Sequence, residues 1–206
     1  MSALDDRRRL TALYLPPADD FSVVDVPDLR FVMVDGTGGH ESDGFKRATR
    51  WLFSAVAPIK QVARQRMGKR FVEAPLECLW WADDMAAFAA GNRAEFRWRQ
   101  MIVTADWVDG PMFDGAVATA SERLGEPPDD LRLERFEEGT SVQIMHIGPE
   151  NEDAWALMAR LHDEYLPDHG LVAAGPHHEI YLSDPARVPP EKLRTVLRQS
   201  VVRAGA

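Results

Sequence analysis

The sequence contains one cysteine (Cys78), no long apolar run and no excess of positive charge. A single cysteine excludes an intrachain disulfide, which fits a reducing cytoplasm. No apolar stretch approaches the roughly 20 residues that a transmembrane helix needs. The charged segment at residues 5–9 is not followed by the apolar segment of a signal peptide. We therefore expect a cytoplasmic protein with no membrane partner.

The charge balance disfavours another class of partner. The formal net charge is −9, and a surface of that sign repels the phosphate backbone, so we expect no nucleic-acid partner. The 206 residues, 45% of them hydrophobic, are enough for a sizeable core. Six tryptophans are many for this length. Those that the core does not need are candidates to line a ligand site.

The order of predicted elements repeats. Apolar residues recur every three or four positions from Asp43 and from about Glu150, which predicts two helices. Asp109 is a candidate N-cap for a third helix that Gly125 ends, and a helical turn is expected at 190–193. Short runs of β-branched and aromatic residues predict strands at 21–26, 30–36, 71–74, 76–81, 96–104, 131–136, 141–147, 171–173 and 178–183, with a short strand at the end.

This order predicts an α+β fold, a duplicated strand–helix–strand–strand module with pseudo-twofold symmetry and a ligand groove between the halves. The whole chain, 1–206, is expected to be one domain. It would comprise an N-terminal arm at 1–20, a first module at 21–104, a linking helix at 109–125 and a second module at 130–206. Pro58 lies inside the first long helical pattern and predicts a kink or break there.

Two β-prone segments each hold one glutamate among aromatic residues, and we treat these glutamates as matching positions. Alternate side chains of a strand share a face, so His177, Glu179 and Tyr181 point to one side. The same rule places Glu77 with Trp81, opposite Cys78 and Trp80. A carboxylate among aromatic rings is costly to bury without a partner, which favours a pocket.

Four stretches give the chain a resemblance to the GyrI-like small-molecule-binding family. They are Pro75–Trp81, Phe136–Gly139, Gln143–Pro149 and His177–Pro185. The resemblance runs from about Tyr14 to Ser200, and it is strongest to the stand-alone members, which lack a DNA-binding domain. Two departures are Cys78, where glycine is expected, and Pro58.

The resemblance implies a duplicated module with a ligand groove, and some stand-alone members are implicated in hydrolysing the cyclopropane ring of DNA-alkylating natural products. It places the family's ligand-contacting glutamate at Glu179. We expect Glu179 and Tyr181 to be catalytic together, because they share a strand face. The expected ligand contacts are Glu77, Trp80, Trp81, Trp98, Met145 and His177. Aromatic walls would raise the pKa of Glu179 and suit it to act as a general base.

Structural alternatives exist for each of these residues. Glu179 would be structural if it paired with an arginine on a neighbouring strand, and tryptophans are more often core than pocket. The pair His177-His178 lacks the spacing of a zinc-binding helix, and the segment Asp35–Gly39 lacks the lysine of a phosphate-binding loop. We therefore expect no metal and no cofactor.

Three functions remain open. The first is hydrolysis of a planar, largely apolar molecule in an aromatic groove with an acidic floor, as a detoxification reaction. The second is non-catalytic multidrug binding, in which the glutamate balances a lipophilic cation. The third is inhibition of DNA gyrase, as the family's namesake suggests.

Overall fold

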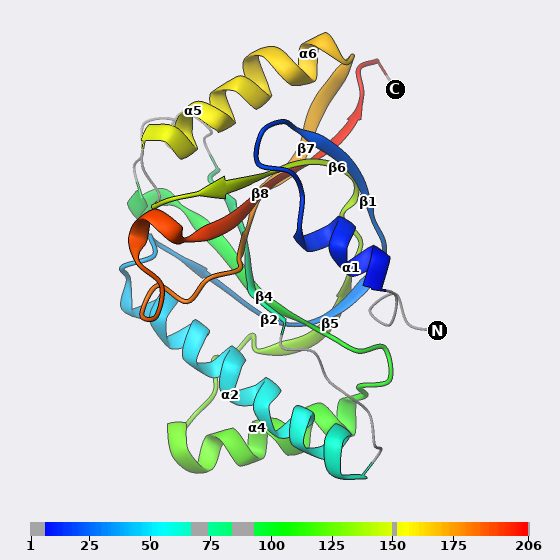
Figure 1. Ribbon diagram of the computed structural model, residues 1–206. Helices are drawn as coiled ribbons and strands as arrows, with labels where there is room; N and C mark the ends of the chain where they lie inside the picture. Colours follow the sequence, from blue (N-terminus) through cyan, green and yellow to red (C-terminus); the bar gives the residue numbers. More distant parts are fainter. Residues whose placement is uncertain (1–6, 67–73, 84–92, 150–151, 206) are drawn as a thin grey trace. The chain divides into compact units, whose positions relative to one another are not determined.

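The computed structural model describes residues 7–66, 74–83, 93–149 and 152–205. The chain divides into two compact units, named here for their place in the sequence. The terminal unit comprises residues 3–28 and 137–206, and the central unit comprises residues 29–136. Figure 1 shows both as mixed helix and strand structures.

In its described residues, the central unit consists of antiparallel strands and two helices. Its strands are β2 (Leu29–Thr37), β3 (Leu76–Trp81), β4 (Arg97–Thr104) and β5 (Arg132–Phe136), in the spatial order β3-β4-β2-β5. Helices α2 (Asp43–Arg66) and α4 (Gly110–Leu124) lie side by side (Figure 1), and a short 3₁₀ turn, η1 (Arg93–Glu95), precedes β4. Asp109 caps α4 as expected, because its carboxylate accepts a 2.9 Å hydrogen bond from the backbone N–H of Met112.

The terminal unit has the corresponding sheet, in the order β1-β6-β8-β7. Its strands are β1 (Ser22–Val26), β6 (Gly139–Ile147), β7 (Leu171–Tyr181) and β8 (Arg194–Arg203). Its helical segments are α1 (Arg7–Tyr14), α5 (Glu152–Arg160), the π-helix η2 (Leu161–Tyr165), α6 (Leu166–Asp168) and the 3₁₀ turn η3 (Pro190–Lys192).

The two units repeat one topology, and the expected α+β fold of duplicated strand–helix–strand–strand modules is confirmed. The run β2–α2–β3–β4 corresponds to β6–α5–β7–β8, and the strands of the two units follow one another in corresponding order. Each sheet also takes a fourth strand from a distant part of the sequence. β1 pairs with β6, and β5 pairs with β2. The expected module boundaries, residues 21–104 and 130–206, instead grouped β1 with β2 and β5 with β6.

Three local features differ from the expectations. Helix α2 continues through Pro58, so no break occurs there. The strands expected at 171–173 and 178–183 form the single strand β7, with a register shift between Ala173 and His177. The second long helix contains a π-helical turn. Most of the strand expected at 71–74 lies outside the described residues.

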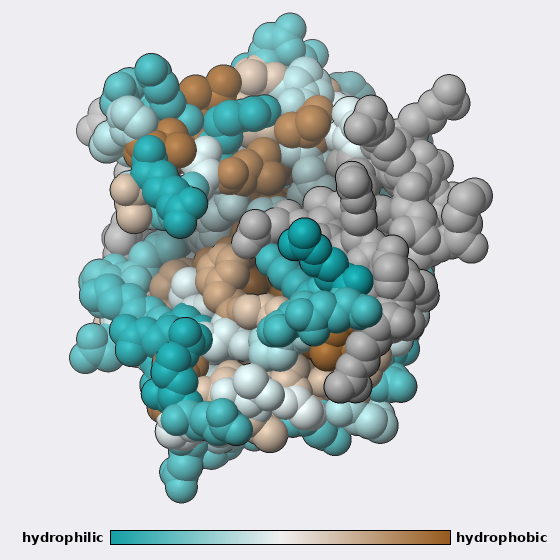
Figure 2. All heavy atoms as spheres, turned by 60° about the horizontal axis from the view of Figure 1, so that its bottom comes forward, coloured by the Kyte–Doolittle hydropathy of each residue, from teal (hydrophilic) through white to brown (hydrophobic). Residues whose placement is uncertain are grey.

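The core of the terminal unit lies between its sheet and its helices. Leu161 and Leu166, at the two ends of the π-helical turn, pack in one buried cluster with Val142, Ile144 and Leu197 of the strands. The opposite face of the same sheet carries a smaller cluster of Met145, Ile180 and Val196. On the molecular face shown in Figure 2, apolar residues emerge as separate brown patches among hydrophilic ones. No helix within the described ranges is long and apolar enough to span a membrane.

Candidate functional site

Three polar side chains form a row along one face of β7. The phenol of Tyr181 donates a 2.5 Å hydrogen bond to Oε2 of Glu179. Nε2 of His177 lies 3.6 Å from Oε1 of the same carboxylate. The side chain of Glu179 is 15% exposed, and that of His177 is 10% exposed. The structure therefore brings together the three residues that alternation placed on one face.

This row faces the helical side of the terminal unit. Glu179 lies opposite Leu197 in the pairing of β7 with β8, and directly paired residues share a face of the sheet. Leu197 packs against Leu161 and Leu166 of the helical segments. The neighbouring His162, in the π-helix, has its pKa lowered by partial burial and by the charge of His177. A π-helical turn is often found at functional sites, and this one approaches the row.

The other face of β7 carries a buried ionic network. Nδ1 of His178 lies 3.0 Å from each carboxylate oxygen of Glu138, and Nη1 of Arg198 donates a 3.0 Å hydrogen bond to Oε2. The side chains of His178, Glu138 and Arg198 are 1–3% exposed. Burial alone would raise the pKa of Glu138, but His178 and Arg198 outweigh it and lower the pKa to about 2. Glu138 is therefore an anion at neutral pH.

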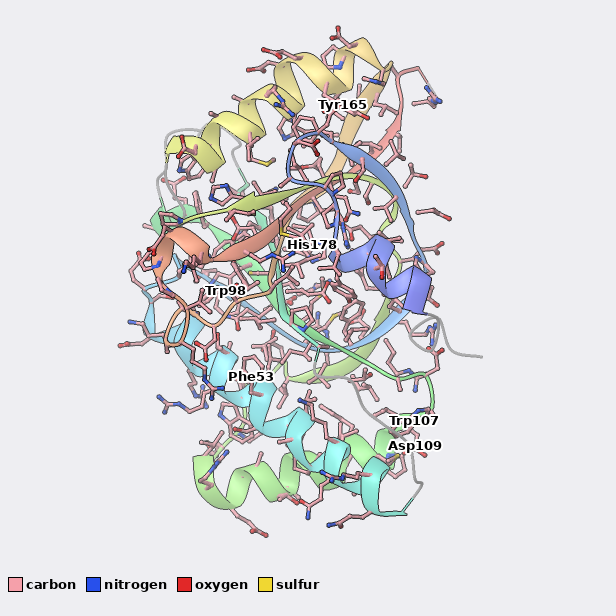
Figure 3. The ribbon with its side chains drawn as sticks, viewed as in Figure 1. Phe53, Trp98, Trp107, Asp109, Tyr165 and His178 are labelled. Carbon is pink, nitrogen blue, oxygen red and sulfur yellow. The ribbon has the colours of Figure 1, made fainter. Side chains whose placement is uncertain are left out.

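The network also fixes the N-terminal helix. Arg198 donates through Nε to Oε1 of Gln143 at 3.0 Å, and through Nη2 to the carbonyl of Leu13. Nε2 of Gln143 donates a 2.7 Å hydrogen bond to the carbonyl of Ala12. These carbonyls belong to the last turn of α1, where a helix has no partners of its own. His178, labelled in Figure 3, lies on this side of the sheet.

Two of the predicted tryptophans lie in the aromatic core of the central unit. Trp80 and Trp98 are paired across β3 and β4, and both contact Phe45 of α2. The Phe45 ring stacks on Trp80 at 5.4 Å and meets Trp98 edge-on at 5.3 Å. Both indoles are buried (Trp98 is labelled in Figure 3). Their role as ligand contacts stays a prediction.

Glu77 and Trp81 lie on the opposite face of β3 from Trp80, as alternation predicts. Trp81 is partly exposed, whereas Glu77 is buried. In the terminal unit, Met145 belongs to the cluster with Ile180, on the face opposite Glu179. The structure therefore does not place Met145 beside the row on β7.

The sequence pattern identified neither Glu138 nor Arg198 as important. Glu138 lies inside the stretch Phe136–Gly139, and 60 residues separate it from Arg198. The missed signal is an arginine inside the apolar strand pattern of 194–203, since a buried guanidinium requires a carboxylate partner. Within the part of the chain that the structure describes, no group of three or more His, Cys, Asp or Glu side chains is placed to hold a metal ion.

Comparison with known proteins identifies the family. The model of the GyrI-like small molecule binding domain matches residues 19–198. The chain belongs to the GyrI-like family. No curated protein matches the sequence.

Solved structures show the same relationship across nearly the whole chain. An uncharacterized conserved protein from Listeria innocua is 29% identical with a TM-score of 0.83, and the match covers 97% of this chain and 98% of that one. A protein described as a hydrolase from the same organism is 30% identical, with a TM-score of 0.76 and coverages of 91% and 94%. A hydrolase encoded by lin2189 of Listeria innocua is 28% identical, with a TM-score of 0.81 and coverages of 97% and 98%. This GyrI-like chain is therefore similar over its length to stand-alone proteins.

Proposed function

We propose that this GyrI-like protein binds planar, largely apolar organic molecules and hydrolyses the cyclopropane ring of DNA-alkylating compounds. Two observations support the proposal. Similar proteins that span the same length are described as hydrolases. The chain also carries a carboxylate and a phenol joined by a 2.5 Å hydrogen bond on one strand face. The single Cys78 is compatible with a detoxification reaction in the reducing cytoplasm.

The reaction would begin with water and a cyclopropane fused to a cyclohexadienone. Glu179 takes a proton from the water as the water oxygen forms a bond to the least substituted ring carbon. The bond between that carbon and the dienone ring breaks, and its electron pair moves through the ring onto the distant carbonyl oxygen. Protonation of this oxygen gives a phenol, so the product is the substrate plus one water. No oxidant or metal is consumed.

Tyr181 and His177 would serve Glu179 in different ways. The phenol of Tyr181 holds the carboxylate in one orientation through the 2.5 Å hydrogen bond. The imidazole of His177, 3.6 Å from the other oxygen, is within reach of the same water. Because the Glu179 side chain is only 15% exposed, its charge is less screened than that of a surface carboxylate. The pairing of Tyr181 with Glu179 is the observation on which the proposal rests.

The test is incubation with a cyclopropane-bearing alkylating agent, followed by mass spectrometry for a gain of one water. We expect Glu179→Gln to lower the hydrolytic rate about 10²–10⁴-fold, the usual contribution of a general base, with little change in affinity for a neutral substrate. Glu77→Gln is the control, because the side chain of Glu77 lies on the face of β3 opposite the one that packs against α2, whereas Glu179 lies on the face of β7 that packs against helices. A Glu179→Gln protein that hydrolyses at the full rate would exclude Glu179 as the base.

A non-catalytic role in binding lipophilic cations is the second candidate. The observation that favours it is the Glu179 carboxylate between an imidazole and a phenol ring, a setting suited to an organic cation. Under this alternative, the wild-type protein shows no turnover. Glu179→Gln then weakens the binding of a planar cation and leaves a neutral analogue unaffected, as a tryptophan fluorescence titration would report.

A further inference from the structure

The exposed side of α2 carries a line of basic side chains with an aromatic ring among them. Because about 3.6 residues complete each turn of a helix, five exposed residues fall within an arc of about 60° around its axis. They are Lys46, Arg50, Phe53, Ala57 and Arg64, called the outer stripe below. The outer stripe is about 27 Å long at the usual rise per residue. Neither the family assignment nor the proposed hydrolysis uses it.

The other sides of α2 are occupied by the fold of the central unit. Trp51, Leu52 and Val56 are at most 1% exposed, and the helix contacts β2, β4 and α4. Arg47, beside the outer stripe, donates a 2.8 Å hydrogen bond to the backbone carbonyl of Glu126. The outer stripe is therefore the part of α2 that faces solvent in this unit.

The charge of the outer stripe is not balanced by the described residues. No described carboxylate forms an ion pair with Lys46, Arg50 or Arg64. The sequence of α2 contains one acidic residue, Asp43, in its first turn. Lys46 and Arg50 are four residues apart, and like charges at this spacing destabilise a helix. An anionic partner would remove this repulsion.

Phe53 adds an apolar contact between the cations. It is 42% exposed, and Figure 3 labels it on α2. Ala57, one turn later, is exposed as well. Basic residues that flank an aromatic residue on one helix face are typical of helices that lie on anionic membranes. In such helices the cations contact the lipid head groups and the aromatic ring enters the interface.

The outer stripe fits a lipid surface better than other polyanions. Duplex nucleic acid offers phosphates but no apolar layer for Phe53, and an acidic protein would have to supply a pocket for the ring. A lipid bilayer offers anionic head groups and an apolar layer along the whole length of a straight helix. We propose that the outer stripe of α2 docks the protein on an anionic lipid surface, with its basic side chains at the head groups and Phe53 in the interface.

The net charge of −9 predicted no membrane partner, but this number is a sum over the whole chain. At physiological ionic strength, interactions between exposed charges more than about 8–10 Å apart are largely screened. A lipid surface that lies against α2 therefore interacts mainly with the outer stripe. Binding of this kind is reversible and weakens as salt is added.

The test is sedimentation of the full chain with lipid vesicles. The anionic probe is phosphatidylcholine with about 30% phosphatidylglycerol, and the neutral comparison is phosphatidylcholine alone. We expect binding to the anionic vesicles only, at about 1 mM lipid, and release of the protein in about 0.5 M salt. Arg50→Gln should lower the partition coefficient about fivefold, and Phe53→Ala should lower it by a similar factor. Arg187→Gln, an equal loss of charge at an exposed arginine of the terminal unit, should leave it unchanged.

Two further measurements separate docking from misfolding and from the proposed hydrolysis. The Tm of Arg50→Gln should equal or exceed that of wild type, since the variant removes the repulsion with Lys46. Glu179→Gln should bind vesicles as wild type does, because Glu179 lies outside the outer stripe. Equal sedimentation with both kinds of vesicle, or equal partition coefficients for wild type and Arg50→Gln, would overturn the proposal. Binding to polyglutamate or duplex DNA without binding to the anionic vesicles would overturn it as well.

Discussion

Glu77 and Glu179 lie on strands that hold equivalent places in the two units, but their side chains differ in orientation. Glu179 lies on the face that packs against helices, and Glu77 lies on the face opposite the one that packs against α2. Glu179 pairs with Leu197 on the side that packs against helices. Glu77 pairs with Met101, and the neighbouring Cys78 and Trp80 take the side that packs against α2. The two glutamates therefore do not occupy matching positions. Glu179 accepts a hydrogen bond from the phenol of Tyr181.

The first prediction concerns that phenol. Tyr181→Phe removes the 2.5 Å hydrogen bond and leaves the ring, so the carboxylate loses its fixed orientation. Because a hydrogen bond to a charged group contributes about 1.5–3 kcal/mol, we expect the hydrolytic rate to fall about tenfold or more at saturating substrate. Tyr165→Phe is the matched control, since this ring packs on Phe21 and His169. Equal rates for the two variants would remove Tyr181 from the mechanism.

The second prediction concerns acid stability. The pKa of Glu138 is about 2 in the folded chain and near 4.5 when unfolded, so the unfolded chain takes up the proton first as the pH falls. The stabilisation is complete above pH 4.5 and is lost between pH 4.5 and 2. A shift of this size corresponds to about 3 kcal/mol in the free energy of unfolding. Urea denaturation from pH 7 to pH 3 measures the loss.

Glu138→Gln provides the matched variant for the same measurement. It leaves Arg198 buried without its counter-charge, so we expect a loss of about 3–5 kcal/mol at pH 7 and a weaker dependence on pH below 4.5. Asp83→Asn removes the partner of Arg97 in an exposed pair and should cost less than about 1 kcal/mol. If the two variants were equally stable, the buried network would not contribute as described.

The sequence predicted the repeated order of elements well because local residue patterns specify each element. Helical periodicity from Asp43, the N-cap at Asp109 and β-prone runs around Glu77 and Glu179 each act within a few residues. Strand pairing is a long-range property, so the exchange of β1 and β5 between the halves of the sequence had no local signature. Alternation within a strand predicted which side chains share a face, but only packing decides which face meets the helices.

The same distinction between local and long-range signals explains which residues of the candidate site could be predicted from the sequence. His177, Glu179 and Tyr181 follow one another at intervals of two residues along β7, so they could be grouped from the sequence. Glu138, His178 and Arg198 come from three separate segments. The register of β7 with β8 pairs His178 with Arg198, and the pairing of β6 with β8 brings Glu138, just before β6, to them. The π-helix was equally hidden, because it adds one residue to a turn without any residue type that marks it.

The third prediction concerns the contact between Gly36 and Trp98. These residues are partners in β2 and β4, and a Cβ on residue 36 would lie 2.2 Å from the indole ring of Trp98. Gly36→Ala therefore forces the buried ring to move, at a cost of about 1–3 kcal/mol. Gly115→Ala, inside α4 with open space around the position, should stabilise the protein by about 0.5–1 kcal/mol. Thermal unfolding followed by near-ultraviolet circular dichroism reports both, and Gly36→Ala with wild-type stability would contradict the packing.

The last prediction tests whether the π-helix lies at the proposed site. Burial and the charge of His177 lower the pKa of His162, so its imidazole should titrate below 6.5 in the folded protein. The folded chain then releases this proton more readily than the unfolded chain, and the corresponding stability is complete above pH 6.5 and declines as the pH falls below it. His177→Gln removes the neighbouring charge and should raise the pKa of His162 towards its ordinary value, while burial holds it below that value. His169→Gln, just after the end of α6, should leave it unchanged. Proton–carbon NMR of the imidazole rings follows each titration, and an unaltered His162 midpoint in His177→Gln would mean that the π-helix does not share the electrostatic environment of the row on β7.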